Sequence, residues 1–215
     1  MGARGPNESG SLPDADESAL LEGARNGDAA SRNELLRRYQ KRLIRMVEFR
    51  ISPALARRVD AADIVQDALL AAARRLEEYF NNSNMDFYVW LRWLTKDRLT
   101  DAQRQHFGAA RRDANREVHA DSVLSRHSAL QLADVLAGHL TSPSRAAARE
   151  EQKAAIQAGL NSMDEQDREI LILRHFEQLS LEEAAQCLSI SKSGANKRHL
   201  KALRELKRRL GKLAE

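Results

Sequence analysis

The stretch "LSLEEAAQCLSISKSGANKRHLKALREL", residues Leu179 to Leu206, decides the fold of the C-terminal part of this chain. Ser180 and Glu183 form the Ser-x-x-Glu pattern of a helix start, in which each side chain satisfies an unpaired backbone N–H near the other. Apolar residues then recur at helical spacing on both sides of a break at residues 189–191. The pattern predicts two short helices joined by a tight turn.

The pair of helices has the residues that a helix-turn-helix motif requires. Such a motif needs a small residue inside the first helix, so that the second can cross close by, and an apolar residue in the turn. Ala184 or Ala185 meets the first need and Ile190 the second. Ser191 can cap the second helix, whereas Ser189 must accept a tight or left-handed backbone at some cost. The sequence favours a DNA-reading helix, with a plain helical hairpin as the alternative.

The second helix is strongly basic. Between Lys192 and Lys212 there are nine Lys or Arg residues and a single acid, Glu205. A segment this basic can bind phosphate, although a solvated helix face is the alternative. The side chains near the helix start that can contact base edges or phosphates are Lys192, Ser193, Asn196, Lys197, Arg198 and Lys201.

A further helix is expected before this motif. Ser162 and Glu165 repeat the capping pattern, which predicts a helix from about Met163. Its apolar stripe consists of Ile170, Leu173 and Phe176. We expect this helix to share one small core with the two helices that follow.

Composition favours a helical protein that stays in the cytoplasm. The 215 residues include only 4 Pro and 10 Gly, with 42% hydrophobic and 31% charged residues. No apolar run approaches the roughly 18 residues of a membrane span, and residues 1–18 lack the apolar core of a signal peptide. The only cysteine, Cys187, cannot form an internal disulfide and is expected to be a small core residue.

No catalytic, metal or cofactor site is expected. The six His residues have no partners at metal-ligand spacing, and the chain contains no HExxH, CxxC or Gly-rich phosphate loop. The sequence therefore favours a binding protein over an enzyme.

An acidic helix face precedes the basic region. Asp63, Gln66 and Asp67 lie at i, i+3 and i+4, so they share one face, opposite the apolar residues of the same segment. Such a face suits a basic protein partner rather than DNA. Ordinary solvated charge at a helix N-terminus is the alternative.

Aromatic residues gather between Tyr79 and Phe107, where seven of the ten in the chain occur. A helix is expected from about Phe87, with a core face formed by Phe87, Trp90, Leu91 and Leu94. Another face would follow a DNA backbone or an opened strand through Arg92, Lys96, Thr100 and Gln103. Tyr88 or Trp93 at its edge could stack on a base.

The polar stretch "NNSNMD", residues 81–86, comes directly before this helix. The amide groups of Asn81, Asn82 and Asn84 are suited to holding a base that has left the duplex stack. An ordinary polar turn is the alternative.

Two parts of the sequence resemble one family of transcription proteins. "MDEQDREILILRHFEQLSLEEAAQCLSISKSGANKRHLKALRELKRRL", residues 163–210, resembles the promoter-binding fourth region of bacterial sigma factors of the extracytoplasmic-function group. "VDAADIVQDALLAAARRL", residues 59–76, and "FYVWLRWLTKDRLTDAQRQ", residues 87–105, are similar to the second region of that group, in the same order. Two matches in order are more specific than a helix-turn-helix alone.

The resemblance implies partners for each surface. The acidic helix would dock on the basic coiled coil of the largest subunit of core RNA polymerase, and the fourth region would lie at the polymerase flap. The loop at 81–86 would occupy the place of the family's base-capturing loop, and an anti-sigma factor would be a further partner. Where the family often has Arg-Asn, this chain has Lys96-Asp97, which puts the bases that it reads in doubt.

The sequence thus predicts an all-α protein with two small helical domains joined by a flexible linker. The expected parts are a disordered tail over 1–16, a sigma region 2-like domain over 17–107, a linker over 108–149 and a region 4-like domain over 150–215. The protein would be a monomer when free and would give core polymerase its promoter specificity. The alternative is a helix-turn-helix repressor or response regulator that does not bind core polymerase. RNA-binding or adaptor proteins and enzymes are further rivals, and no constellation of residues supports an enzyme.

Overall fold

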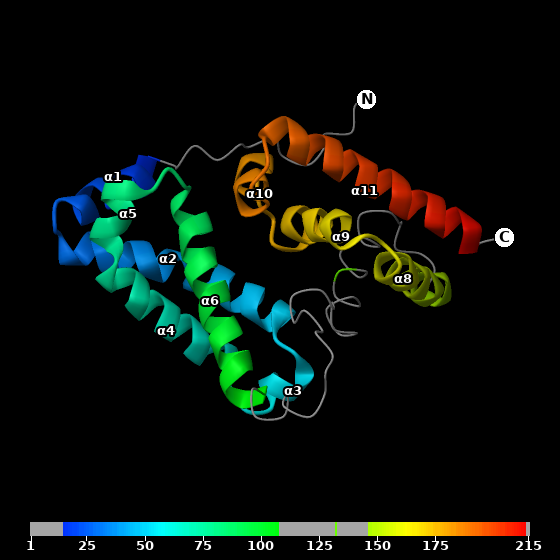
Figure 1. Ribbon diagram of the computed structural model, residues 1–215, viewed down its shortest axis with the longest axis horizontal. Helices are drawn as coiled ribbons and strands as arrows, with labels where there is room; N and C mark the ends of the chain where they lie inside the picture. Colours follow the sequence, from blue (N-terminus) through cyan, green and yellow to red (C-terminus); the bar gives the residue numbers. More distant parts are fainter. Residues whose placement is uncertain (1–14, 108–131, 133–145, 214–215) are drawn as a thin grey trace. The chain divides into compact units, whose positions relative to one another are not determined.

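The computed structural model describes residues 15–107, 132 and 146–213, and every regular element within them is helical (Figure 1). The all-α prediction is therefore confirmed. The chain divides into two compact units, one up to residue 115 and one from residue 116 onward. Most of the predicted tail and linker lies outside the described residues. Helix α1 (Ala15–Arg25) begins within the predicted tail, and α8 (Ala146–Asn161) begins within the predicted linker.

Within residues 15–107, the first unit contains three long helices and three shorter ones. The long helices are α2 (Ala29–Arg50), α4 (Ala61–Arg74) and α6 (Phe87–Phe107). The shorter helices are α1, α3 (Pro53–Ala56) and α5 (Leu76–Asn82). Asp28 and Asp60 begin α2 and α4 by accepting hydrogen bonds from backbone N–H groups of the first turn.

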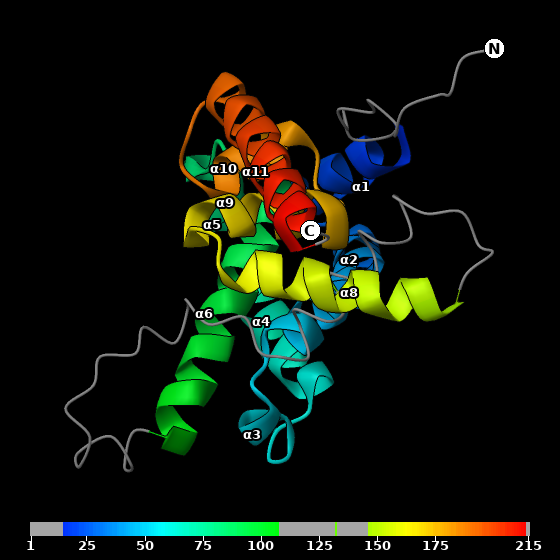
Figure 2. The same cartoon turned by 90° about the vertical axis from the view of Figure 1, so that its right-hand side faces the viewer.

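The core of the first unit lies where α2, α4 and α6 meet, and Figures 1 and 2 both show α6 lying against α4. Its fully or nearly fully buried members include Leu35, Leu43, Met46, Val47, Phe49, Val65, Ala68, Ala72, Leu91 and Leu94. Tyr79 joins α5 to α6 through ring contacts with Phe87 at 5.1 Å and Trp90 at 4.8 Å between centroids. Burial raises the pKa of Tyr79 to about 12, so its hydroxyl stays protonated.

The helices described in the second unit are α8, α9 (Glu165–Leu171), the π-helical segment η2 (Ile172–Phe176), α10 (Leu181–Cys187) and α11 (Lys192–Leu213). Its core gathers the buried sides of all of them, with Ile156, Leu160, Ile170, Leu173, Leu179, Ala184, Ala195, Ala202 and Leu206. The shared core expected from the apolar stripes is confirmed.

The predicted start of α9 was two residues too early. The Ser162 hydroxyl does not cap this helix but donates to the Gly159 carbonyl at 2.9 Å, at the end of α8. Asp164 is the cap, accepting from the N–H groups of Gln166 at 2.9 Å and Asp167 at 3.4 Å. A carboxylate suits a helix N-terminus better than a hydroxyl because it also interacts with the helix dipole.

The helix-turn-helix turn follows the sequence expectation. Ser180 and Glu183 form a complete capping box at the start of α10. Ser189 has a φ of 53°, the left-handed conformation expected of it, and the Ile190 N–H donates to the Ala185 carbonyl at 3.0 Å. The Ser191 hydroxyl accepts from the Gly194 N–H at 3.0 Å and caps α11. Cys187 is half-buried, so it lines the core edge rather than its centre.

Candidate functional site

The start of α11 presents the predicted DNA contacts to solvent. Lys192, Ser193, Asn196 and Lys197 are exposed, and Arg198 is half-exposed. The helix is held from the opposite side by three buried residues, Ala195, Ala202 and Leu206. We call the exposed side the reading face, defined by the six predicted residues Lys192, Ser193, Asn196, Lys197, Arg198 and Lys201.

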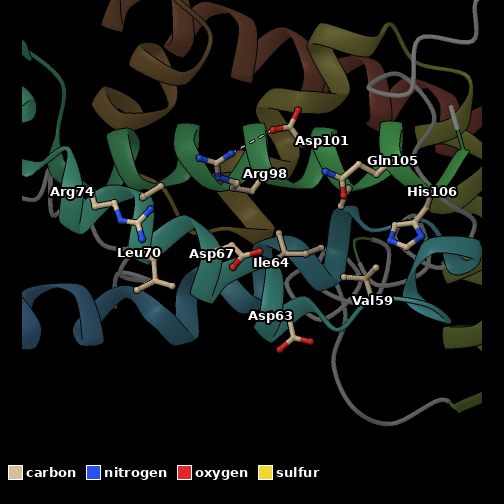
Figure 3. A pocket seen from close by; sticks show the side chains of 12 residues that line it. Val59, Asp63, Ile64, Asp67, Leu70, Arg74, Arg98, Asp101, Gln105 and His106 are labelled. Carbon is tan, nitrogen blue, oxygen red and sulfur yellow. Dashed lines mark hydrogen bonds and ion pairs between the residues drawn. The ribbon is translucent and has the colours of Figure 1, made fainter.

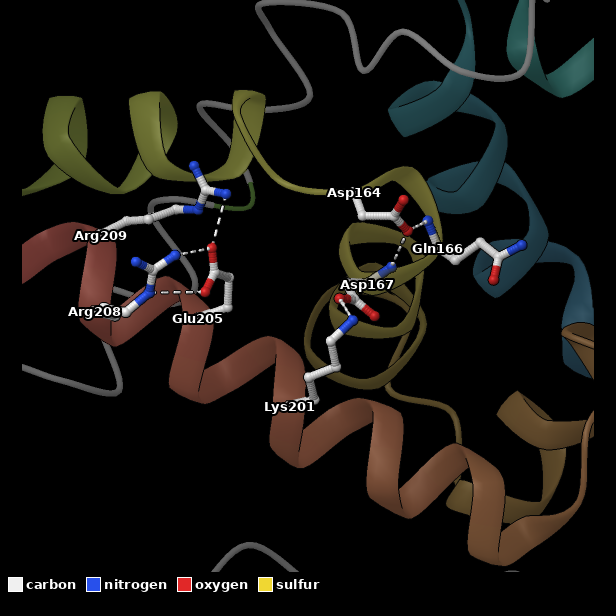
Figure 4. A network of polar contacts seen from close by, with 7 residues as sticks. All are labelled: Asp164, Gln166, Asp167, Lys201, Glu205, Arg208 and Arg209. Carbon is white, nitrogen blue, oxygen red and sulfur yellow. Dashed lines mark hydrogen bonds and ion pairs between the residues drawn. The ribbon is translucent and has the colours of Figure 1, made fainter.

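Two lysines of the reading face are paired with acids. Lys192 forms an ion pair with Glu182 of α10 at 2.9 Å, and both side chains are more than 60% exposed. Lys201 reaches Asp167 of α9 at 2.6 Å (Figure 4). Asp167 is buried, and its carboxylate raises the pKa of Lys201 through a hydrogen bond. DNA phosphates would therefore compete with these acids for both lysines.

The following turns of α11 remain basic. Glu205, the only acid on this helix, binds Arg208 and Arg209, each at 2.7 Å (Figure 4). Arg209 also donates to the Ser162 hydroxyl at 2.6 Å, which ties α11 to the end of α8. The pairing lowers the pKa of Glu205, mainly through its hydrogen bond to Arg208.

A histidine pair joins α11 to η2, and no pattern in the sequence predicted it. The Nε2 atoms of His175 and His199 lie 2.9 Å apart, so one ring donates a hydrogen bond to the other. Burial lowers the pKa of His199, and the nearby charge of Arg174 lowers it further. The pair therefore links α11 to η2 through a side-chain hydrogen bond.

The acidic residues lie together on α4. Asp63, Gln66 and Asp67 are all exposed, whereas Ile64, Val65, Ala68, Leu69 and Ala72 face the core. The predicted shared face is present, and we call it the acidic face.

A groove runs beside the acidic face, between α4 and α6 (Figure 3). It has a volume of about 410 Å³, and its α4 side includes Asp63, Asp67, Leu70 and Arg74. Arg98 and Asp101 of α6 form an ion pair at 3.5 Å on the other side. Leu70 in this groove is 56% exposed. The sequence did not identify it as a surface residue, because spacing along a helix does not reveal which apolar side chain remains exposed to solvent.

The predicted base-holding residues occupy two kinds of structure. Asn81 and Asn82 belong to the last turn of α5, and only Asn84 lies in the connection to α6. All three side chains are exposed. An exposed amide keeps both donors and its acceptor available to a base edge.

The connection between α5 and α6 is held by local hydrogen bonds. The Ser83 hydroxyl accepts from the Met85 N–H at 3.1 Å, and Tyr79 donates its hydroxyl to the Met85 carbonyl at 3.1 Å. Asp86 caps α6 by accepting from the Tyr88 N–H at 2.9 Å. The loop that carries Asn84 is thereby fixed at both ends.

The prediction that Arg92 lies on a DNA-contacting face of α6 was wrong, because its side chain is only 6% exposed. The first two turns of α6 are enclosed on several sides by the rest of the unit, so all residues from Phe87 to Arg92 are buried. The core roles predicted for Phe87, Trp90, Leu91 and Leu94 are confirmed. Tyr88 is also buried and cannot stack on a base at the surface, whereas Trp93 is 50% exposed.

The remaining residues of that face are partly accessible. Lys96, Thr100 and Gln103 are half-exposed. The Thr100 hydroxyl donates to the Lys96 carbonyl at 2.9 Å, so it has only acceptor capacity left for a ligand. Trp93 lies near them with the Arg75 guanidinium 5.8 Å from its ring centroid.

The described residues contain neither a membrane-spanning helix nor a cluster of metal ligands. No helix among them is long and apolar enough to cross a bilayer. In the same part of the chain, no three His, Cys, Asp or Glu side chains are grouped so that they could hold a metal ion.

Comparisons with known proteins identify both units. Residues 35–107 match the family model of sigma-70 region 2, and residues 159–208 match that of sigma-70 region 4. The two matches together cover more than half of the chain. RNA polymerase sigma-H factor of Pseudomonas aeruginosa is 26% identical over 174 residues, which are 81% of this chain and 83% of that protein. The fold is similar to that of CnrH, which was solved in complex with the cytosolic domain of CnrY. The TM-score is 0.52 and the sequence identity 22%, and the match covers 92% of this chain and 98% of the CnrH chain.

Proposed function

The chain belongs to the extracytoplasmic-function group of sigma factors and directs promoter-specific transcription initiation, and we propose that it does so through separate surfaces on its two domains. Residues 17–107 would bind core polymerase and the downstream promoter element, and residues 150–215 would bind the upstream element. Sigma factors are not enzymes; the polymerase performs the chemistry. A repressor or response regulator without polymerase binding would have no use for region 2, so that alternative is set aside.

The acidic face is proposed as the polymerase-docking surface. Asp63, Gln66 and Asp67 would face the basic coiled coil of the largest subunit, since complementary charge accelerates association and disfavours wrong partners. Leu70 supports this assignment, because an exposed leucine beside two carboxylates can be buried when the coiled coil covers the groove. The observation that carries the proposal is that two exposed carboxylates, those of Asp63 and Asp67, lie beside the exposed side chain of Leu70.

The reading face is proposed to enter the major groove of the upstream element. A helix whose opposite side is buried can place its exposed donors against base edges and phosphates without unfolding. Lys192, Lys197, Arg198 and Lys201 would neutralise phosphates, while Ser193 and Asn196 would reach base edges. The fourth region would also meet the polymerase flap.

The downstream element is proposed to be held, partly melted, by residues around the α5–α6 connection. The exposed amides of Asn81, Asn82 and Asn84 would hold a base that has left the stack. Lys96, Thr100 and Gln103 would follow the same strand along α6. Arg92 is left out of this surface because it is buried.

Free in the cytoplasm, the protein is proposed to be a monomer that an anti-sigma factor can hold inactive. The solved structure of CnrH contains the cytosolic domain of CnrY, so binding of another protein has a precedent on this fold. Such a partner would compete with core polymerase if it covered the acidic face.

The test is transcription by purified core polymerase on fragmented genomic DNA, with and without the full chain. New start sites that depend on the protein, preceded by a shared upstream sequence, are expected. A chain that joins core polymerase yet produces no new start site would refute the proposed function.

A further inference from the structure

Leu200 is an apolar residue on the basic helix that carries the reading face. It is 43% exposed, and the other large hydrophobic residues exposed within the described parts of the chain are Leu70, Met85 and Trp93, all in the first unit. A leucine at this place does not stabilise the core of its own domain. Its side chain is available for contact with a ligand of α11.

Helical spacing puts Leu200 beside the proposed base contacts. Ser193, Lys197 and Leu200 lie at i, i+4 and i+7, which fall on one side of a helix. All three are exposed, while Ala195, Ala202 and Leu206 are buried on the other side. Leu200 is therefore available to a duplex that meets Ser193 and Lys197.

The edges of the bases in the major groove are almost entirely polar. The C5-methyl group of thymine is the apolar exception, and apolar side chains contact it in DNA complexes. Placed against a polar edge instead, Leu200 would remove water from hydrogen-bonding groups without replacing it. An exposed leucine among lysines and a serine therefore fits the thymine methyl group better than it fits the polar base edges.

We propose that Leu200 is a specificity-determining residue that contacts a thymine methyl group of the upstream promoter element. The inference rests on the proposed function, because it requires the reading face to lie in the major groove. It adds a feature of the recognised sequence: at least one thymine whose methyl group, rather than its hydrogen-bonding edge, is read.

The experiment uses core polymerase reconstituted with the full chain. A randomised duplex is enriched on this complex, and the enriched duplex is then synthesised with deoxyuridine replacing each thymidine in turn. Deoxyuridine pairs as thymidine does and lacks only the methyl group. At one or two positions the wild-type complex should lose about fourfold in affinity, which corresponds to one buried methyl group.

Variants of Leu200 assign that loss to its side chain. Leu200→Ala and Leu200→Gln should bind both duplexes with equal affinity, and Leu200→Met should keep the preference for thymidine. Because Leu200 is exposed, helix content should be the same in all four proteins. A double-mutant cycle compares the loss of affinity caused by Leu200→Ala with the loss caused by the missing methyl group, separately and together. The coupling energy from this cycle isolates their contact from losses of affinity that have other causes.

The outcomes separate this inference from the proposed function. The role of Leu200 alone is overturned if deoxyuridine does not change the affinity of the wild-type complex for the enriched duplex. It is also overturned if deoxyuridine lowers the affinity of the wild-type and Leu200→Ala complexes equally. Failure of the reconstituted complex to enrich any duplex overturns both.

Discussion

Single residues with left-handed backbone form two corners of the second unit. Gln178 has a φ of 57° before α10, and Ser189 has a φ of 53° between α10 and α11. A residue with a Cβ pays about 1 kcal/mol or more in this region, a cost that glycine avoids. The strain at Ser189 was predictable from the short break between two helical patterns. That at Gln178 was not, because no turn signal precedes Leu179.

Ser189→Gly should stabilise the helix-turn-helix unit by about 0.5–1 kcal/mol, since it removes the left-handed strain. Native-state hydrogen exchange of the α10 and α11 amides measures this change. Ser193→Gly is the matched control: the same substitution within the helix α11 should destabilise the unit by about 0.5 kcal/mol. Equal effects of the two substitutions would contradict the strain at Ser189.

His199 should make the stability of the second unit sensitive to pH. Its pKa is lowered in the folded protein, so below about pH 6.5 the unfolded chain binds a proton that the folded chain does not. Protection of α11 should be constant above that pH and fall as the pH decreases, by at most about 1.4 kcal/mol per pH unit.

His199→Leu should remove this dependence because it leaves no titrating group at that position. An NMR titration of the His199 ring checks the premise directly. A pKa at or above its usual value of 6.5 would contradict the account of its burial.

At the scale of elements, local sequence signals predicted the positions of the helices more reliably than they predicted which side chains are exposed. The capping box at Ser180 and the cap at Ser191 could be read from the sequence because both act within one turn. The burial of Arg92 could not, because it depends on how α6 packs against other helices. The same reason explains why neither Leu70 nor Leu200 was identified from spacing.

The ion pair between α10 and α11 should limit binding to DNA. Glu182→Gln would free Lys192 for a phosphate, so affinity for a non-specific duplex should rise by about two- to threefold at 0.15 M salt. The dependence of log K on log salt should steepen by up to about one. Fluorescence anisotropy with a labelled duplex measures both.

Glu34→Gln is the control for this change. It alters the net charge equally but removes an exposed partner of Arg37 on α2, in the other unit. A rise of the same size in both variants would mean that net charge, rather than the release of Lys192, sets the affinity.

At the scale of the whole molecule, two units carry surfaces of opposite chemistry. The acidic face and Leu70 belong to the first unit, and the reading face belongs to the second. The distribution of charge along the sequence was enough to predict this separation. The groove that accompanies the acidic face depends on the packing of α4 against α6 and became visible only in the structure.

The proposed docking surface predicts a loss of polymerase binding when its charge is reversed. Asp63→Lys with Asp67→Lys should abolish co-elution of the chain with core polymerase in size-exclusion chromatography, because lysines would face a basic partner. Both aspartates are exposed, so tryptophan fluorescence from Trp90 and Trp93 should report an intact first unit. Glu48→Lys, an exposed charge reversal on α2, should leave co-elution unchanged.

The most direct test compares this charge-reversed pair with Lys197→Ala and Arg198→Ala in the full chain. Each pair is measured for association with core polymerase and for binding, as the reconstituted complex, to a promoter whose upstream element has been mapped. The account predicts that the aspartate pair prevents association, and that the basic pair associates normally but binds the promoter at least tenfold more weakly, as expected from two lost phosphate or base contacts. Loss of association in both pairs, or normal promoter binding by the basic pair, would contradict it.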